Sequence, residues 1–105
     1  MEKQIINPWK WQDARNYVQA VDVSNVEGTL YVSGQTEIND EGISSVADMR
    51  KQLLETLENL EKVILKANYE VKNIVRLNIY TTDSASLFEH FDVFKAWIKK
   101  NEIKQ

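Results

Sequence analysis

Two arginines are the side chains of this sequence that could hold a small anionic ligand. Arg76 lies within a strand-like run, and Arg15 lies just before the first such run. A guanidinium group donates paired N–H groups to a carboxylate, so either residue could clamp an acid. Arginines on strand faces are more often ion-paired or stretched along the surface toward water, and that alternative stays open.

Residue types argue against metal and thiol chemistry. The chain has no cysteine, which excludes disulfides and thiolate nucleophiles. With the single histidine His90, a zinc or iron site of the usual type is not expected. His90 lies beside an apolar stripe and is expected to be a partly exposed structural residue. We expect no metal and no cofactor.

Gly34 is a further candidate because it lies inside a run with strand composition. Residues 17–23 and 29–35 are rich in β-branched and aromatic side chains, and the polar residues between them suit a hairpin with a loop of about five residues. In the second run Leu30, Val32 and Gly34 share one face. A lone glycine in a strand indicates a kink near an interface or a close approach of the backbone to another group.

A first helix is predicted by apolar residues at spacings of three and four from Val46 to Ala67. Ser45 and Asp48 resemble a capping box at its start. Asn68 can take the left-handed conformation that ends a helix.

A third strand is predicted from Val71 to Thr81, with Leu77 on one face and Arg76 on the other. Asp83 or Ser84 then caps a second helix. Its apolar stripe consists of Leu87, Phe91, Phe94 and Ile98, widened by Phe88 and Trp97.

The predicted order is therefore strand, strand, helix, strand, helix, an α+β arrangement with both helices packed on one face of a sheet. Residues 4–6 could add a short edge strand. One more strand after the second helix would cover the sheet better, and we expect it to be absent.

Composition supports one domain over residues 1–105, with 43% apolar and 28% charged residues. The net charge of −3 gives no basic stripe for nucleic acid. No apolar run approaches the roughly 20 residues of a membrane helix, and the N-terminus lacks the apolar run of a signal peptide. A cytoplasmic location is the default expectation, without nucleic-acid or membrane partners.

Three segments together resemble the Rid/YjgF (reactive intermediate deaminase, endoribonuclease L-PSP-like) family. They are Tyr-Val-Gln-Ala-Val at 17–21, Leu-Tyr-Val-Ser-Gly-Gln at 30–35, and Ile-Val-Arg-Leu-Asn-Ile-Tyr-Thr-Thr-Asp at 74–83. The order and spacing match, and the resemblance runs from about Asn7 to Lys100. Each motif alone has low specificity, but the Ser-Gly-Gln and Tyr-Thr-Thr-Asp pair at this separation is fairly specific.

The resemblance implies a chorismate-mutase-like mixed sheet and a homotrimer with a ligand pocket at each subunit interface. Family enzymes hydrolyse 2-imino acids to 2-keto acids and ammonia. By position, Tyr17, Ser33 and Gly34 correspond to pocket residues of the family. Phe91 aligns where active members often have asparagine, which would make this pocket more apolar.

The family's clamping arginine and water-positioning glutamate are expected to lie beyond the last residue, which leaves the catalytic residues unknown. Two hypotheses remain open. The first is an imine deaminase of the 2-iminobutanoate/2-iminopropanoate type, with Arg76 or Arg15 holding the carboxylate. The second is a non-catalytic oligomeric module, or truncated remnant, that binds a small metabolite.

Overall fold

The computed structural model describes residues 1–44 and 47–105 and has an α+β fold. Its elements are β1 (Glu2–Ile6), β2 (Ala20–Ser24), α1 (Met49–Lys66), α2 (Ser84–Glu89) and α3 (Phe91–Lys100), with short 3-10 helices at Asp13–Arg15 and Val71–Asn73. The predictions made for Ser45 and Val46 lie outside the described residues.

Helix α1 follows the predicted apolar stripe. Leu53, Leu57 and Ile64 are buried on its inner face. The Asp48 side chain caps the N-terminus by accepting a hydrogen bond from the Lys51 amide at 2.9 Å, which satisfies one of the free N–H groups of the first turn. The predicted left-handed residue Asn68 has φ 62° and ends the helix.

The second predicted helix is divided at His90, whose backbone (φ −111°, ψ 18°) leaves the helical region. Asp83 caps α2, as predicted, by accepting from the Ser86 amide at 3.1 Å. Helix α3 buries Phe94, Trp97 and Ile98. Because the chain turns between α2 and α3, Phe88 is 67% exposed, and its predicted place in the apolar stripe is wrong.

The sheet differs from the prediction. Strand β2 pairs antiparallel with β1, from Glu2 opposite Ser24 to Ile6 opposite Ala20, and not with residues 29–35. The predicted edge strand at residues 4–6 is thus one half of a two-stranded sheet. The predicted hairpin between 17–23 and 29–35 is wrong, because residues 29–35 form no strand and β2 pairs with the N-terminal segment.

Residues 29–35 and 74–81 are not strands in the described chain, and the predicted third strand begins instead as a 3-10 helix. No backbone hydrogen bond joins residues 29–35 or 75–81 to another described segment. Side chains bind some neighbouring carbonyls: Asn59 Nδ2 donates to the carbonyls of Thr36 and Ile38, both at 2.8 Å. These segments have the composition of strands but, within the part of the chain that the structure describes, they pair with no neighbouring segment, which a strand requires.

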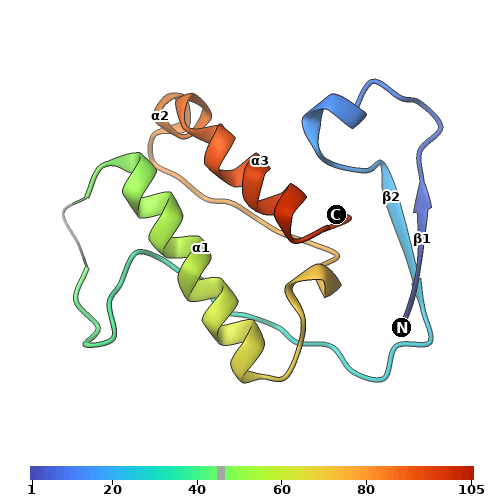
Figure 1. Cartoon of the computed structure of the whole chain (residues 1–105), viewed down its shortest axis with the longest axis horizontal. Coiled ribbons are helices and arrows are strands. Elements are labelled where there is room, and N and C mark those ends of the chain that lie inside the picture. The colour runs from blue at the N-terminus through green and yellow to red at the C-terminus, as the bar shows by residue number, and fades with distance from the viewer. Residues whose placement is uncertain (45–46) are drawn as a thin grey trace.

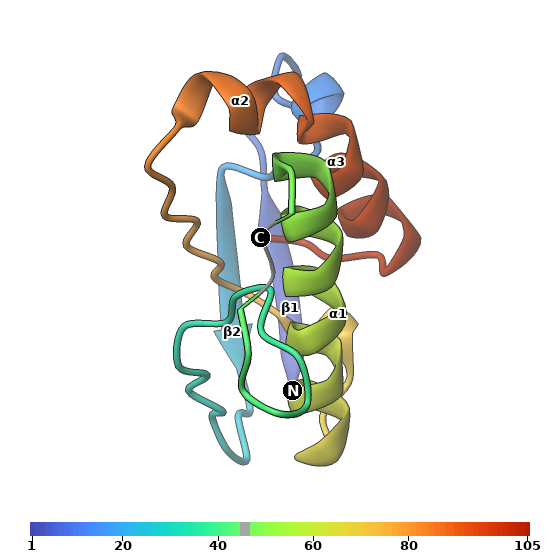
Figure 2. The ribbon, with the colours of Figure 1, turned by 90° about the vertical axis from the view of Figure 1, so that its left-hand side faces the viewer.

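The helices gather on one side of the molecule and the β1–β2 sheet lies on the other (Figure 1). Figure 2, seen from the helical side, shows α1 in front of the two strands. The core forms where α1 meets α3, together with Val71, Leu87 and Ile103. Trp97 joins the two helices by donating its indole N–H to Glu61 Oε1 at 2.6 Å. None of the helices described is both long and apolar enough to cross a membrane.

Candidate functional site

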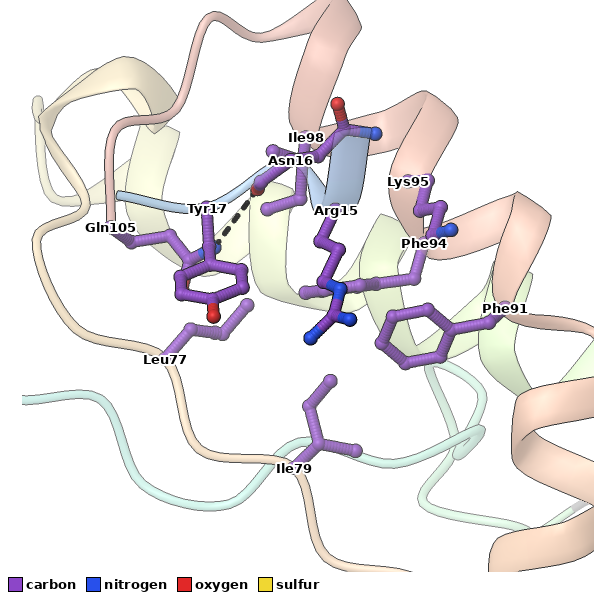
Figure 3. A pocket seen from close by; sticks show the side chains of 10 residues that line it. All are labelled: Arg15, Asn16, Tyr17, Leu77, Ile79, Phe91, Phe94, Lys95, Ile98 and Gln105. Atoms are coloured by element: carbon purple, nitrogen blue, oxygen red, sulfur yellow. Dashed lines mark hydrogen bonds between the residues drawn. The ribbon is translucent and has the colours of Figure 1, made fainter. Parts of the chain in front are cut away.

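A cavity of about 320 Å³ lies between α3, the segment after the first 3-10 helix, and residues 77–79 (Figure 3). Its lining residues are Arg15, Asn16, Tyr17, Leu77, Ile79, Phe91, Phe94, Lys95, Ile98 and Gln105. The volume falls at the lower end of the range typical of small-ligand sites.

Helical and extended periodicity explain the apolar part of this wall. Phe91, Phe94 and Ile98 recur at spacings of three and four, so they share one face of α3. Leu77 and Ile79 are two residues apart in an extended segment, so they point to the same side. Phe91 packs against Phe94 with ring centroids 5.0 Å apart. Five of the lining side chains are therefore apolar.

A left-handed turn brings the polar part of the wall into place. Asn16 has φ 57°, which turns the chain after the 3-10 helix and directs Arg15 and Tyr17 to the cavity. The segment is fixed to the last residues of the chain, because the Val18 amide donates to the Gln105 carbonyl at 3.1 Å. Gln105 Nε2 also lies 3.5 Å from the Asn16 carbonyl (Figure 3).

Two cations face the cavity without an acidic partner. The Arg15 guanidinium extends into the centre of the site (Figure 3) and lies 5.2 Å from the centroid of the Trp11 ring. Within residues 1–44 and 47–105, neither Arg15 nor Lys95 forms an ion pair, and no aspartate or glutamate lines the cavity. The arrangement is suited to binding an anion.

Gln12 holds the loop that carries these groups. It is the only polar residue fully buried in the described chain. Its Nε2 donates to the Trp9 carbonyl at 2.9 Å and to Asp13 Oδ1 at 3.1 Å. Its Oε1 lies 3.4 Å from Gln19 Nε2. Since buried polar groups are costly unless paired, these contacts fix the loop conformation.

The family model described as endoribonuclease L-PSP matches residues 10–105, nearly the whole chain. The chain belongs to the Rid/YjgF family. That match includes every residue that lines the cavity.

Curated relatives agree with the family assignment. A RutC family protein of Aquifex aeolicus is 31% identical over 88 residues, covering 84% of this chain and 68% of that protein. A RutC family protein of Pasteurella multocida is 36% identical over 67 residues, 64% of this chain and 50% of the relative. TdcF of Escherichia coli K12, provisionally named a reactive intermediate deaminase, is 24% identical over 86 residues.

The alignments span from half to about two thirds of these relatives' own length: 68%, 50% and, for TdcF, 64%. No solved structure gave a significant match.

The structure brings together only some of the residues that the Rid resemblance singled out. Tyr17 and Phe91 line the cavity, and Arg15 lies beside them. Ser33, Gly34 and Arg76 are exposed and do not line it. Among the described residues, a Cβ atom added to Gly34 would meet nothing within 4 Å, so they do not show the close backbone approach considered for this glycine.

Sequence reasoning missed several residues of the site. Leu77 and Ile79 both line the cavity. The predicted alternation already placed them together on the apolar face of the segment, opposite Arg76, which was the available signal. Lys95 lies one residue after Phe94 and reads from sequence as a solvated charge. The burial of Gln12 could not be predicted, since no feature of the neighbouring sequence indicates that this glutamine is buried.

Proposed function

We propose that this Rid-family chain binds a 2-imino acid in the cavity beside Arg15 and hydrolyses it to the 2-keto acid and ammonia. The observation that carries this proposal is the meeting of Tyr17, Phe91 and Arg15 around one cavity of suitable size. Two of these positions correspond to pocket positions of the family, and the third supplies a cation. The proposed setting is the cytoplasm.

The chemistry asks little of the protein. The carbon of an imine that is protonated on nitrogen is already electrophilic. The site therefore needs only to hold the carboxylate, orient the imine and admit one water. Water adds to the imine carbon, a proton moves to the nitrogen, and the C–N bond then breaks to release ammonia. In this proposal Arg15 holds the carboxylate and the Tyr17 hydroxyl hydrogen-bonds the water.

We further propose that the chain works as a homotrimer with a chorismate-mutase-like sheet. Among the described residues, no backbone hydrogen bond joins residues 29–35 or 75–81 to another segment, which supports the addition of strands because extended edges attract partners. Ser33, Gly34 and Arg76 are exposed outside the cavity of their own chain. In this proposal they reach a ligand only across a subunit boundary.

The second candidate function is binding without turnover, by an oligomeric small-metabolite module. One observation favours it: no aspartate or glutamate side chain among the described residues lines the cavity, so these lining side chains offer no carboxylate as a general base for the water.

A steady-state assay separates the two functions. An amino-acid oxidase generates 2-iminopropanoate in place, and its disappearance is followed with and without the protein. The deaminase predicts saturable acceleration above buffer, and Arg15→Gln lowers kcat/KM at least about tenfold because a charge-assisted hydrogen bond is lost. If the protein binds an acid but does not accelerate imine hydrolysis even at high protein concentration, the deaminase is excluded and the non-catalytic binding module remains.

A further inference from the structure

We infer that the cavity selects monocarboxylic 2-oxo and 2-imino acids with a larger apolar side chain, anchored by Arg15 at the carboxylate. This inference rests on the proposed function for the reacting group, but it concerns recognition and can be tested by binding alone. It assigns Arg15, rather than Arg76, as the anchor.

Arg15 is held ready for an anion by its aromatic neighbours. Trp11 lies under its guanidinium at 5.2 Å, stacks on Trp9 at 6.3 Å and meets the edge of Tyr17 at 6.2 Å. The guanidinium is planar, so stacking on one face leaves its edge N–H groups available for two parallel hydrogen bonds to a carboxylate. Gln12 fixes the loop beneath the stack and is therefore a positioning residue.

The wall around the Arg15 guanidinium is apolar. It consists of Leu77, Ile79, Phe91, Phe94 and Ile98. Phe94 and Ile98 are 8% and 3% exposed, so this part of the wall is fixed by the core and not by mobile surface groups. An uncharged hydrocarbon side chain is the complement of such a surface.

The size of the cavity leaves room for acids larger than the smallest ones. Its volume of about 320 Å³ is well above the roughly 10–15 Å³ that one water needs on a probe-based measure. If the imino acid derived from alanine were bound, water would fill much of the remaining space and stay in contact with the apolar wall. Each further buried methylene is expected to raise affinity about fourfold.

Lys95 raises an alternative, because a second cation could pair with a second carboxylate. The apolar side chains beside the two cations favour a monocarboxylate, and tighter binding of a dicarboxylate is an outcome of the test. Lys95 also disfavours ligands with a cationic side chain.

Isothermal titration with stable 2-oxo acids tests the inference on the full chain. The probes are 4-methyl-2-oxopentanoate, pyruvate and 2-oxoglutarate. We expect 4-methyl-2-oxopentanoate to bind at least about tenfold tighter than pyruvate, and tighter than 2-oxoglutarate. Arg15→Gln should weaken its binding at least about tenfold. Arg50→Gln is the matched control: it removes an exposed arginine outside the cavity and should leave affinity unchanged.

The apolar wall is tested by Ile79→Thr, which is suitable because Ile79 is 40% exposed and not part of the core. It should reduce the preference for 4-methyl-2-oxopentanoate over pyruvate several-fold. Phe91→Leu, the second variant, should do the same by removing aromatic surface from the apolar wall.

Three results would overturn the inference: equal affinity for 4-methyl-2-oxopentanoate and pyruvate, tightest binding of 2-oxoglutarate, or an Arg15→Gln variant that binds as the wild type does. Selective binding without imine hydrolysis would support the inference and remove the deaminase. Hydrolysis without selectivity would do the reverse.

Discussion

At the scale of single residues, Arg15 and Gln12 show how the direction of an exposed charged side chain can be fixed toward a binding site. Arg15 is exposed, yet its direction is set by Trp11, and Trp11 belongs to a loop pinned by the buried Gln12. A mobile arginine would lose side-chain entropy on binding an acid. The aromatic stack reduces that loss.

Gln12→Ala is expected to weaken acid binding indirectly, because the loop that positions Arg15 is no longer held in place. It removes the donor to the Trp9 carbonyl and leaves partners unpaired, which also lowers the free energy of unfolding by about 1–3 kcal/mol. Titration with 4-methyl-2-oxopentanoate below the unfolding transition measures the first effect, and urea denaturation measures the second. In an Arg15→Gln background the binding effect should vanish; an additive loss in this double-mutant cycle would contradict the positioning role.

The pair of Glu37 and Ser44 predicts a pH effect outside the cavity. The Ser44 hydroxyl donates to Glu37 Oε1 at 2.5 Å and, as the main cause, lowers the pKa of that carboxyl below its ordinary value of 4.5. The ionised form is therefore favoured in the folded chain, so the stabilisation is present above pH 4.5 and is lost as pH falls through the lowered pKa. Ser44→Ala should raise the pKa of Glu37, measured by NMR titration; an unchanged titration would exclude this bond in solution.

The candidate site could be predicted from sequence only where a residue's type or its resemblance carried information. Tyr17 and Phe91 came from the family resemblance, and Arg15 came from its charge. Gln12 could not be predicted, because its burial depends on tertiary contacts with the Trp9 carbonyl and Gln19. From sequence, Arg76 and Arg15 were equal candidates for holding a carboxylate. In the structure Leu77 and Ile79 line the cavity, and Arg76, on the opposite face of the same segment, does not.

Elements with local hydrogen bonds were predicted better than elements that need a partner. The 3.6-residue period of α1, its end at Asn68 and the Asp83 cap of α2 depend on neighbours in sequence, and the structure contains all three. Residues 29–35 and 74–81 have β composition, but composition does not name the partner strand. The N-terminal segment paired with β2 instead.

Asp48→Ala is expected to lower the free energy of unfolding by about 1 kcal/mol, since the cap of α1 is lost. The urea midpoint measures the change. Asp40→Ala is a matched control, because it removes an exposed acid from a loop. Equal effects of the two substitutions would argue that the Asp48 contribution is not a cap.

Across the whole molecule, exposed apolar side chains accompany the unpaired segments. Tyr31 and Tyr80 are each 90% exposed, and Val75 is 39% exposed. Aromatic residues in such numbers on unpaired extended segments favour association between chains. A surface of this kind fits the proposed oligomer.

Sedimentation velocity should therefore find an oligomer at micromolar protein. The Tyr31→Lys, Tyr80→Lys double variant should shift it toward monomer, because both substitutions place charge on the surface to be buried. Leu65→Lys is the control, since Leu65 is a comparably exposed apolar residue (58%) on α1. A wild-type chain that stays a stable monomer would contradict the proposed assembly.

The most direct test of the central claim is an NMR titration of the arginine side chains with 4-methyl-2-oxopentanoate. The Nε–H signals of Arg15, Arg50 and Arg76 report on each guanidinium separately. A carboxylate held in the cavity should shift the Arg15 signal in a saturable way and leave that of Arg50 in place. Saturation at Arg76 with Arg15 unmoved, or no arginine shift at all, would contradict the assignment of this cavity as the acid-binding site.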